Sequence, residues 1–517
     1  MSTKVRHFLK LRLGTAVLAL VLAASVLSGC GGGGTSSSAT LTYAVGTDAQ
    51  TLDPQFVTDI PSAVAVMQIH ETLVARDENM NFIPGLATEW SVAEDGCTWT
   101  FKLRQGVKFH DGADFNAEAV KYNFDRILDP ATGSPRRSVA SMIKEVKVVG
   151  PYEVQIITND PYGPMLAQIS SYNLAIISPK SGAELGKGYA QKPAGTGPFK
   201  LKSWTPGQSL VLERFDGYWG DKPKVKEIEF KVVPEDGTRT MLLKTGGADV
   251  VAGVPAFELE NLKKDPNVNL IMKPGFRTIY VGMNCSKEPF DDPRVRQAVN
   301  YAIDREAIVN YVLRGAATVG VGPESPAIPG AAKNLVPYTY NPEKAKQLLK
   351  EAGYPNGFKT VFHTPSGRYP MDQQVAEAVV GQLKEVGIDA ELQILDWGAY
   401  QAMLDKAEES RLFLLGKGSP SGDPDMTLTL SFGTNEKMNS AKYSNPEVDE
   451  LIKQQRVCVD PVERQQILQT IQEKIHADAP WAVLYYEQIL IGTRSNVKGL
   501  QVLPNEIVLF KGVSVEK

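Results

Sequence analysis

Residues 358–394, "FKTVFHTPSGRYPMDQQVAEAVVGQLKEVGIDAELQI", decide the fold of this chain. The two ends of the stretch, 358–364 and 388–394, have the residue types and spacing of strands. Between them, 370–387 has the apolar spacing of a helix, with Pro370 at its start and Gly387 after its end. Strand, helix and strand in this order predict a doubly wound α/β sheet.

The same pattern continues beyond this stretch. Residues 397–409 predict a further helix, and residues 411–416 predict a further strand. Sheets of this class bind ligands at the carboxyl ends of their strands. We therefore expect ligand-binding residues in the loops that follow the three strands, which are 365–370, 396–400 and 416–425.

The N-terminal half mixes strands and helices. Residues 41–45 predict a strand, and Asp95-Gly96 supplies the turn of a hairpin. Asn116 is placed to cap a helix whose apolar residues share one face. Further hairpins are expected around 150–151 and 203–209, and we find no internal repeat.

Composition places the chain among globular proteins. It has 517 residues, of which 43% are apolar and 22% charged, and this length favours two or three lobes over one core. The net charge is −4. An acidic balance argues against a nucleic-acid partner, because neutralising phosphates requires clustered Lys and Arg.

The first 30 residues have the plan of a bacterial export signal. Basic residues precede an apolar run over 14–27, and Leu27-Ser28-Gly29-Cys30 resembles the bacterial lipobox, in which the cysteine is lipidated and becomes the new N-terminus. We expect cleavage after 1–29 and a lipid anchor on Cys30, with 30–40 as a flexible tether. Cleavage removes four basic residues and no acidic residue, so the mature chain has a net charge near −8.

Neither disulfides nor a metal site are expected to organise the mature chain. Besides the lipidated Cys30 it has three cysteines, Cys97, Cys285 and Cys458, which allow at most one internal disulfide. No two of its four histidines are four residues apart, and no cysteine cluster is present. We expect no metal held by protein ligands and no cofactor.

Six stretches resemble the family 5 extracellular solute-binding proteins, receptors that deliver peptides, nickel chelates, glutathione and similar solutes to ABC importers. They are "IHETLVARD" (69–77), "PGLATEWSVAEDGCTWTFKLRQGVKFHDGADFNAEAVKYNFDRI" (84–127), "GTGPFKLKSW" (195–204), "PFDDPRVRQAVNYAIDREAIV" (289–309), "NPEKAKQLLKEAGYPNGF" (341–358) and "YSNPEVDELI" (443–452). The resemblance implies a monomeric binding protein with the two-lobed periplasmic-binding-protein type II fold. It also implies a small-molecule or peptide solute in the interlobe cleft and a membrane permease as partner.

The resemblance also implies a division of the chain. Lobe I combines 41–62, 188–283 and 487–517, and it carries an extra α+β subdomain, 63–187. Lobe II spans 284–486, with the crossings between lobes near Asn284 and Glu487.

Two candidate contacts lie in the first two loops of lobe II. Arg368 matches by position the arginine that holds the ligand carboxylate in dipeptide-binding relatives, and its fork of donors suits that contact. The alternative for Arg368 is a solvated loop arginine. Trp397 either stacks on the ligand or caps the sheet.

The third loop, "GKGSPSGDPD" (416–425), departs from the peptide-binding relatives. Pro420 occupies the slot of the aspartate that holds a peptide amine in those relatives, so the resemblance leaves dipeptide specificity open. Lys417 beside Arg368 favours a solute rich in anionic groups, and Ser419 and Asp423 are further candidate contacts. Turn and helix-cap chemistry is the alternative for Asp423.

In lobe I, "QFVTDI" (55–60) matches a segment that lines the cleft in relatives, which makes Thr58 and Asp59 candidates. Arg137, in "GSPRRSV", is either a second contact to an anion or part of a solvated pair. Two other functions stay open. Ser141-x-x-Lys144, Ser171-x-Asn173 and Lys244-Thr-Gly246 occur in the order of the motifs of penicillin-recognising serine hydrolases. An anchored sensor or chaperone without a transporter is the third reading.

Overall fold

The computed structural model describes residues 40–406 and 411–516. Cys30, the tether before residue 40 and the last residues of the predicted 397–409 helix lie outside the described residues. Within the described part of the chain, no helix is both long and apolar enough to cross a bilayer.

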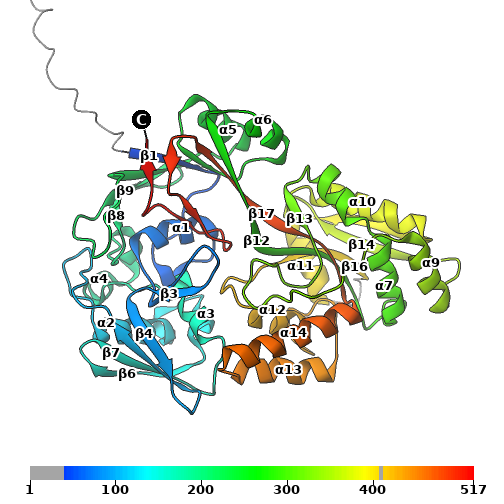
Figure 1. The fold of residues 1–517 in the computed structure, drawn as a ribbon, viewed down its shortest axis with the longest axis horizontal. Helices are drawn as coiled ribbons and strands as arrows, with labels where there is room; N and C mark the ends of the chain where they lie inside the picture. The colour runs from blue at the N-terminus through cyan, green and yellow to red at the C-terminus, as the bar shows by residue number, and fades with distance from the viewer. Residues whose placement is uncertain (1–39, 407–410, 517) are drawn as a thin grey trace, which may run out of the picture. The chain divides into compact units, whose positions relative to one another are not determined.

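One large sheet of eleven strands, counted over the described residues, joins the two halves of the structure (Figure 1). Its spatial order is β15 (Ile388–Leu395), β14 (Phe358–Pro365), β16 (Leu412–Lys417), β12 (Val268–Met283), β17 (Trp481–Arg494), β11 (Val250–Ala252), β1 (Thr40–Val45), β10 (Glu227–Val232), β9 (Ser209–Arg214) and β8 (Phe199–Thr205), and β13 (Ala317–Val319) also pairs with β17.

The segment that predicted the fold forms strand, helix and strand as expected. β14 and β15 pair in parallel from Phe358↔Ile388, and β16 pairs in parallel with the other edge of β14. The helix α10 (Asp372–Glu385) begins later than predicted, because Met371 before it has a left-handed backbone with φ 57°. Gly387 has φ +92°, which a side chain would strain, and so lets the chain turn directly from α10 into β15.

Two long strands connect the two halves of the sheet. In β12, residues 278–283 pair with β16, whereas residues 268–274 pair only with β17. In β17, residues 491–493 pair with β11. The β12–β17 register shifts between Pro274 and Thr278, so the ladder is irregular where these strands pass from one half of the sheet to the other.

Helices cover both faces of the half of the sheet that holds β14 to β16. Ile279 and Val281 pack with α7 (Pro293–Ala302), α9 (Pro342–Glu351) and α10. Tyr280 points the opposite way, as alternation requires, and packs with α11 (Trp397–Lys406), α12 (Asp425–Phe432), α13 (Pro446–Val457) and α14 (Pro461–Asp478). This double covering confirms the α/β pattern predicted from the sequence.

The other half of the sheet has its own hydrophobic clusters. α1 (Ile60–Ile69) packs with β1 and residues near the C-terminus, and α5 (Asp236–Thr245) and α6 (Leu259–Lys263) form a smaller cluster. Several short helices complete the chain: α3 (Met165–Ile169), α4 (Pro179–Leu185) and α8 (Arg305–Ala307).

A separate four-stranded antiparallel sheet lies within residues 63–187. Its order is β4 (Ala87–Val92), β5 (Thr98–Leu103), β7 (Glu153–Thr158) and β6 (Ile143–Gly150), with α2 (Ala117–Leu128) packed on it, and the short β2 (Val74–Arg76) and β3 (Phe82–Pro84) form a separate pair. The predicted hairpins are present. Asn116 caps α2 as expected, since its side chain accepts from the Ala119 amide at 3.0 Å.

This smaller sheet region also touches the C-terminal half away from the long strands. The Gly163 amide donates to the Arg456 carbonyl at 2.7 Å, and a Cβ at Gly163 would lie 2.1 Å from the Cys458 carbonyl oxygen. The Arg76 guanidinium donates to the Ser421 carbonyl at 3.0 Å. The two halves of the chain therefore meet at a second set of contacts.

Candidate ligand-binding cleft

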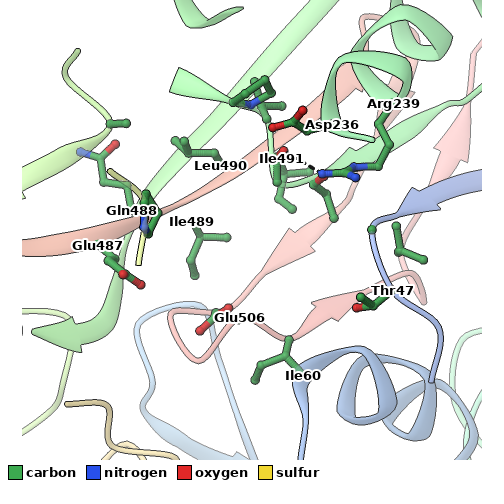
Figure 2. Close-up of a pocket in the computed structure, with 18 of the residues that line it drawn as sticks. Thr47, Ile60, Asp236, Arg239, Glu487, Gln488, Ile489, Leu490, Ile491 and Glu506 are labelled. Carbon is green, nitrogen blue, oxygen red and sulfur yellow. Dashed lines mark hydrogen bonds between the residues drawn. The ribbon is translucent and has the colours of Figure 1, made fainter. Parts of the chain in front are cut away.

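A cavity of about 740 Å³ lies where β12 and β17 pass between the halves of the sheet. Its wall is contributed by both halves. Tyr43, residues 45–49, α1 and residues 252–257 lie on one side, and residues 312–314, 316–317, 370 and 371 lie on the other. Figure 2 shows the β17 residues Glu487 to Ile491 along this wall, with Ile60 and Glu506 opposite. The volume is in the range of small-molecule sites, and the lining is mainly apolar.

Two of the charged residues in the wall are fully engaged by the protein. The Arg239 guanidinium donates to four backbone carbonyls, those of Val233, Pro234, Ala252 and Gly253, at 2.7–3.3 Å. The Asp48 carboxylate accepts from the Trp204 indole at 3.1 Å and from the Gly207 amide at 2.8 Å. These side chains hold the loops around the cavity and have little capacity left for a ligand.

Asp236, Glu487 and Glu506 are the other acidic residues of the wall, and Glu487 and Glu506 share a cationic neighbour. Arg277 pairs with Glu487 at 3.0 Å and lies 4.0 Å from Glu506. Burial raises the pKa of the Glu487 carboxyl to about 7, with Arg277 and Arg368 opposing this rise and Glu506 adding to it. One guanidinium is thus shared by two carboxylates.

The three predicted loops of lobe II do come together. The Arg368 guanidinium lies 5.0 Å from the centre of the Trp397 ring, in cation–π range, and Trp397 in turn stacks on Tyr400 at 5.8 Å. The Gly416 amide donates to the Tyr369 hydroxyl at 2.9 Å, which ties the third loop to the first. Arg368 and Trp397 both remain exposed.

Asp372, the first residue of α10, shapes the loop that carries Arg368. Its buried carboxylate accepts from the backbone amides of Gly367, Arg368 and Tyr369 at 2.8–3.2 Å. An anion beside converging amides at a helix N-terminus is a stable arrangement. The sequence analysis missed this residue, although an acidic residue in the first turn of a helix was a signal available for it.

Lys417 is the last residue of β16, directly after Gly416. It pairs in register with Thr278 of β12, and burial lowers the pKa of its ammonium group, against the opposing effect of Glu324. Burial also raises the pKa of the Glu324 carboxyl well above its usual range. The pKa of Lys417 is therefore influenced by an acidic group of the protein itself.

Ser419 and Asp423 are held within their own loop. The Ser419 hydroxyl donates to the Asp423 carbonyl at 2.6 Å, and the Asp423 carboxylate accepts from the Asp425 amide at 2.9 Å. The same carboxylate forms a bidentate pair with Arg464 at 2.7 and 2.8 Å, with the two side chains only 9% and 11% exposed. This geometry favours the turn and cap alternative for Asp423.

The lobe I candidates gather around the start of α1. Asp59 caps that helix, accepting from the Ser62 amide at 2.8 Å and from its hydroxyl at 2.9 Å, and Thr58 beside it is exposed. Arg136 donates to the Val57 carbonyl at 2.8 Å, which brings the exposed Arg137 near the same loop. Ile60, the next residue after Asp59, lines the cavity.

None of the eight predicted ligand contacts is itself part of the cavity lining, although neighbours of Arg368 and Asp59 are. Among the residues that were missed, Glu487 had been noted only as a strand crossing, and Arg277 and Glu506 had no motif around them. They meet because the long strands and the C-terminal segment bring positions 277, 487 and 506 together.

The residues of the serine-hydrolase motifs have separate structural partners. The Ser141 hydroxyl donates to the Ser138 carbonyl at 2.8 Å, the Asn173 amide donates to the Pro54 and Val57 carbonyls at 3.0 Å, and Lys244 pairs with Glu258 at 2.7 Å. Within 40–406 and 411–516, no group of three or more His, Cys, Asp or Glu is placed to hold a metal ion.

Two long strands join the two halves of the large sheet, a cavity lies beside them, and one half carries a smaller antiparallel sheet with its own helix. This arrangement defines a two-lobed binding protein. Comparison with known sequences gives the family. Residues 81–439 match the bacterial extracellular solute-binding proteins, family 5. The chain is also 32% identical over 509 residues to the glutathione-binding protein GsiB of Escherichia coli K12, covering 97% of this chain and 98% of that protein. The chain therefore belongs to the family 5 solute-binding proteins.

Solved structures agree with this assignment. The periplasmic binding protein DppA of Helicobacter pylori, in complex with the peptide STSA, is 31% identical with a TM-score of 0.75, over 92% of this chain and 98% of that one. HbpA2 of Haemophilus parasuis is 28% identical with a TM-score of 0.86, over 92% and 100% of the two chains. The predicted family and the predicted type II fold are confirmed, and the chain is an exported substrate-binding protein of the kind that serves ABC importers.

Proposed function

We propose that this protein captures a peptide or peptide-like solute in the cleft at the crossing strands and delivers it to the permease of an ABC importer. The observation that carries the proposal is the cavity of about 740 Å³ whose wall comes from both halves of the chain. The relatives named above, a glutathione-binding protein and a protein solved with a bound peptide, support this class of solute.

In this proposal the protein is a monomer held at the membrane by lipid on Cys30. The two lobes close on the solute, lobe II being 284–486 and lobe I being 41–62, 188–283 and 487–517. The irregular pairing between Pro274 and Thr278 supports bending in that part of β12. Arg368 and Trp397 are the first proposed contacts, because they are exposed and adjacent at the strand ends. Thr58, Asp59, Arg137, Lys417, Ser419 and Asp423 stay predictions.

Native mass spectrometry of the purified, ligand-stripped protein tests the proposal. We expect one solute per chain, with a Kd near the micromolar range, for glutathione or for di- to tetrapeptides, since about −8 kcal/mol is within reach of a few buried contacts. A nickel–histidine chelate serves as the comparison from outside this class. A flat response to every peptide and to glutathione would contradict the proposal.

A further inference from the structure

The cavity wall contains hydrogen-bonding groups that the protein leaves unused. Tyr485 is 1% exposed and lines the cavity, and its hydroxyl has no partner among the described residues. Gln488 also lines the cavity, and its amide oxygen is buried and unpartnered, while its amide nitrogen donates to the Thr318 hydroxyl at 3.1 Å. Buried polar groups without partners are uncommon, and a ligand is one reason for them.

Glu506 adds a negative charge to this part of the wall. Its only cationic neighbour among the described residues is Arg277 at 4.0 Å, and that guanidinium lies closer to Glu487. Glu506 also has φ +68°, an uncommon backbone for a side-chain-bearing residue. The turn 503–507 holds it there through backbone bonds of 2.8 and 3.0 Å between Leu503 and residues 507 and 506. Figure 2 shows Glu506 near Ile60, with Glu487 and Ile489 on β17 across from it.

The carboxylates of the lobe II loops are already used by the protein. Asp423 pairs with Arg464, the Asp425 carboxylate accepts from the Gln455 amide at 2.6 Å, and Asp372 holds backbone amides. Pro420, in the same loop, carries no charge. The carboxylates of the cavity wall that lie beside Tyr485 and Gln488 are Glu487, which Arg277 pairs, and Glu506.

The groups gathered here are acceptors: the Glu506 carboxylate, the Glu487 carboxylate with one pairing to Arg277, the Gln488 amide oxygen and the Tyr485 hydroxyl, which can also accept. We infer that Glu506 and Glu487, with Tyr485 and Gln488, form a subsite for a cationic N–H donor group of the solute, an ammonium or a guanidinium. The apolar remainder of the cavity accommodates the aliphatic part that follows this group. The inference rests on the proposed function and adds a cation requirement at the crossing strands, besides the predicted anion contact at Arg368.

Matched probes with and without the positive charge test the inference by calorimetric titration. The probes are Leu-Leu-Leu, glutathione, the N-acetyl form of each, and N-acetyl-Leu-Leu-Arg. Whichever of Leu-Leu-Leu and glutathione binds the unaltered protein, we expect its N-acetyl form to bind at least tenfold more weakly. Glu506→Gln should weaken binding of the charged form to a similar extent and leave binding of the acetylated form unchanged. If N-acetyl-Leu-Leu-Arg binds with an affinity that depends on Glu506, the subsite takes a guanidinium. If it does not, the subsite takes an ammonium.

Two further variants separate binding from folding. Tyr485→Phe removes an unpartnered buried hydroxyl, so the melting temperature should stay equal or rise, while affinity for the charged probe falls several-fold. Glu184→Gln, in the exposed part of α4 away from the cavity, is the matched control and should change neither quantity. Binding of a charged probe that is equal in Glu506→Gln and unaltered protein would overturn the cation subsite and leave the proposed function standing. Failure of every probe to bind would overturn both.

Discussion

The loop 416–425 and the cavity wall at 485–506 both present acidic side chains, but the protein treats them differently. In the loop, Asp423 is locked by Arg464 with both side chains about nine-tenths buried. In the wall, Glu506 lies 4.0 Å from a guanidinium that is already paired with Glu487. An acidic residue in a recognisable motif is thus a weaker sign of ligand contact than an acidic residue that has no close cationic partner within the protein.

The largest effect is expected where the loop charge is locked. Arg464→Met keeps the aliphatic stem but leaves the Asp423 carboxylate without its cation, whereas Asp425 keeps its pair with Arg456 at 3.3 Å. Removing one partner of a buried ion pair should lower the free energy of unfolding by about 3–5 kcal/mol, measured by urea denaturation. Arg137→Met, an exposed arginine, is the control and should stay within about 0.5 kcal/mol. A stable Arg464→Met protein that fails to bind solute would return Asp423 to the ligand contacts and reverse the comparison.

A smaller effect, on binding instead of stability, is expected at Arg368. Arg368→Ala should lower the affinity for a carboxylate-bearing solute tenfold or more, because a charged hydrogen bond contributes about 1.5–3 kcal/mol. Leu-Leu-Leu and its C-terminal amide make the comparison: the variant should lose affinity for the acid and not for the amide. Arg368→Lys keeps the charge without the planar fork, so its affinity for the acid should lie between those of Arg368→Ala and the unaltered protein. Equal curves for Arg368→Ala and unaltered protein would remove Arg368 from the cleft.

The fold was predictable from the sequence because its signals are local. Proline before and glycine after α10, the turn at Asp95-Gly96 and the Asn116 cap each act within a few residues. The start of α10 was predicted too early, at Pro370. The left-handed Met371 and the use of Asp372 to bind loop amides are set by packing around that loop, which spacing does not encode.

The site was predictable only in part, for a related reason. The three loops could be found because strand ends of a parallel sheet lie at one edge, and Arg368, Trp397 and Gly416 do meet there through direct contacts or through Tyr369. The acceptors of the wall could not be found in this way. Arg277, Glu487 and Glu506 come from three distant parts of the chain, and the unpartnered state of Tyr485 exists only once its neighbours are in place.

The smallest effect is expected at Asp59. Replacing one carboxylate oxygen by an amide nitrogen there distinguishes an acidic residue used by the protein from one used by the solute. Both of its carboxylate oxygens accept from Ser62, so Asp59→Ala should cost about 1 kcal/mol as a lost helix cap, measured by thermal unfolding. Asp59→Asn keeps a capping oxygen and should retain stability and, within twofold, affinity for Leu-Leu-Leu. An Asp59→Asn protein of full stability with weakened binding would place its charge with Glu506 among the solute contacts, since only a ligand would then require the carboxylate.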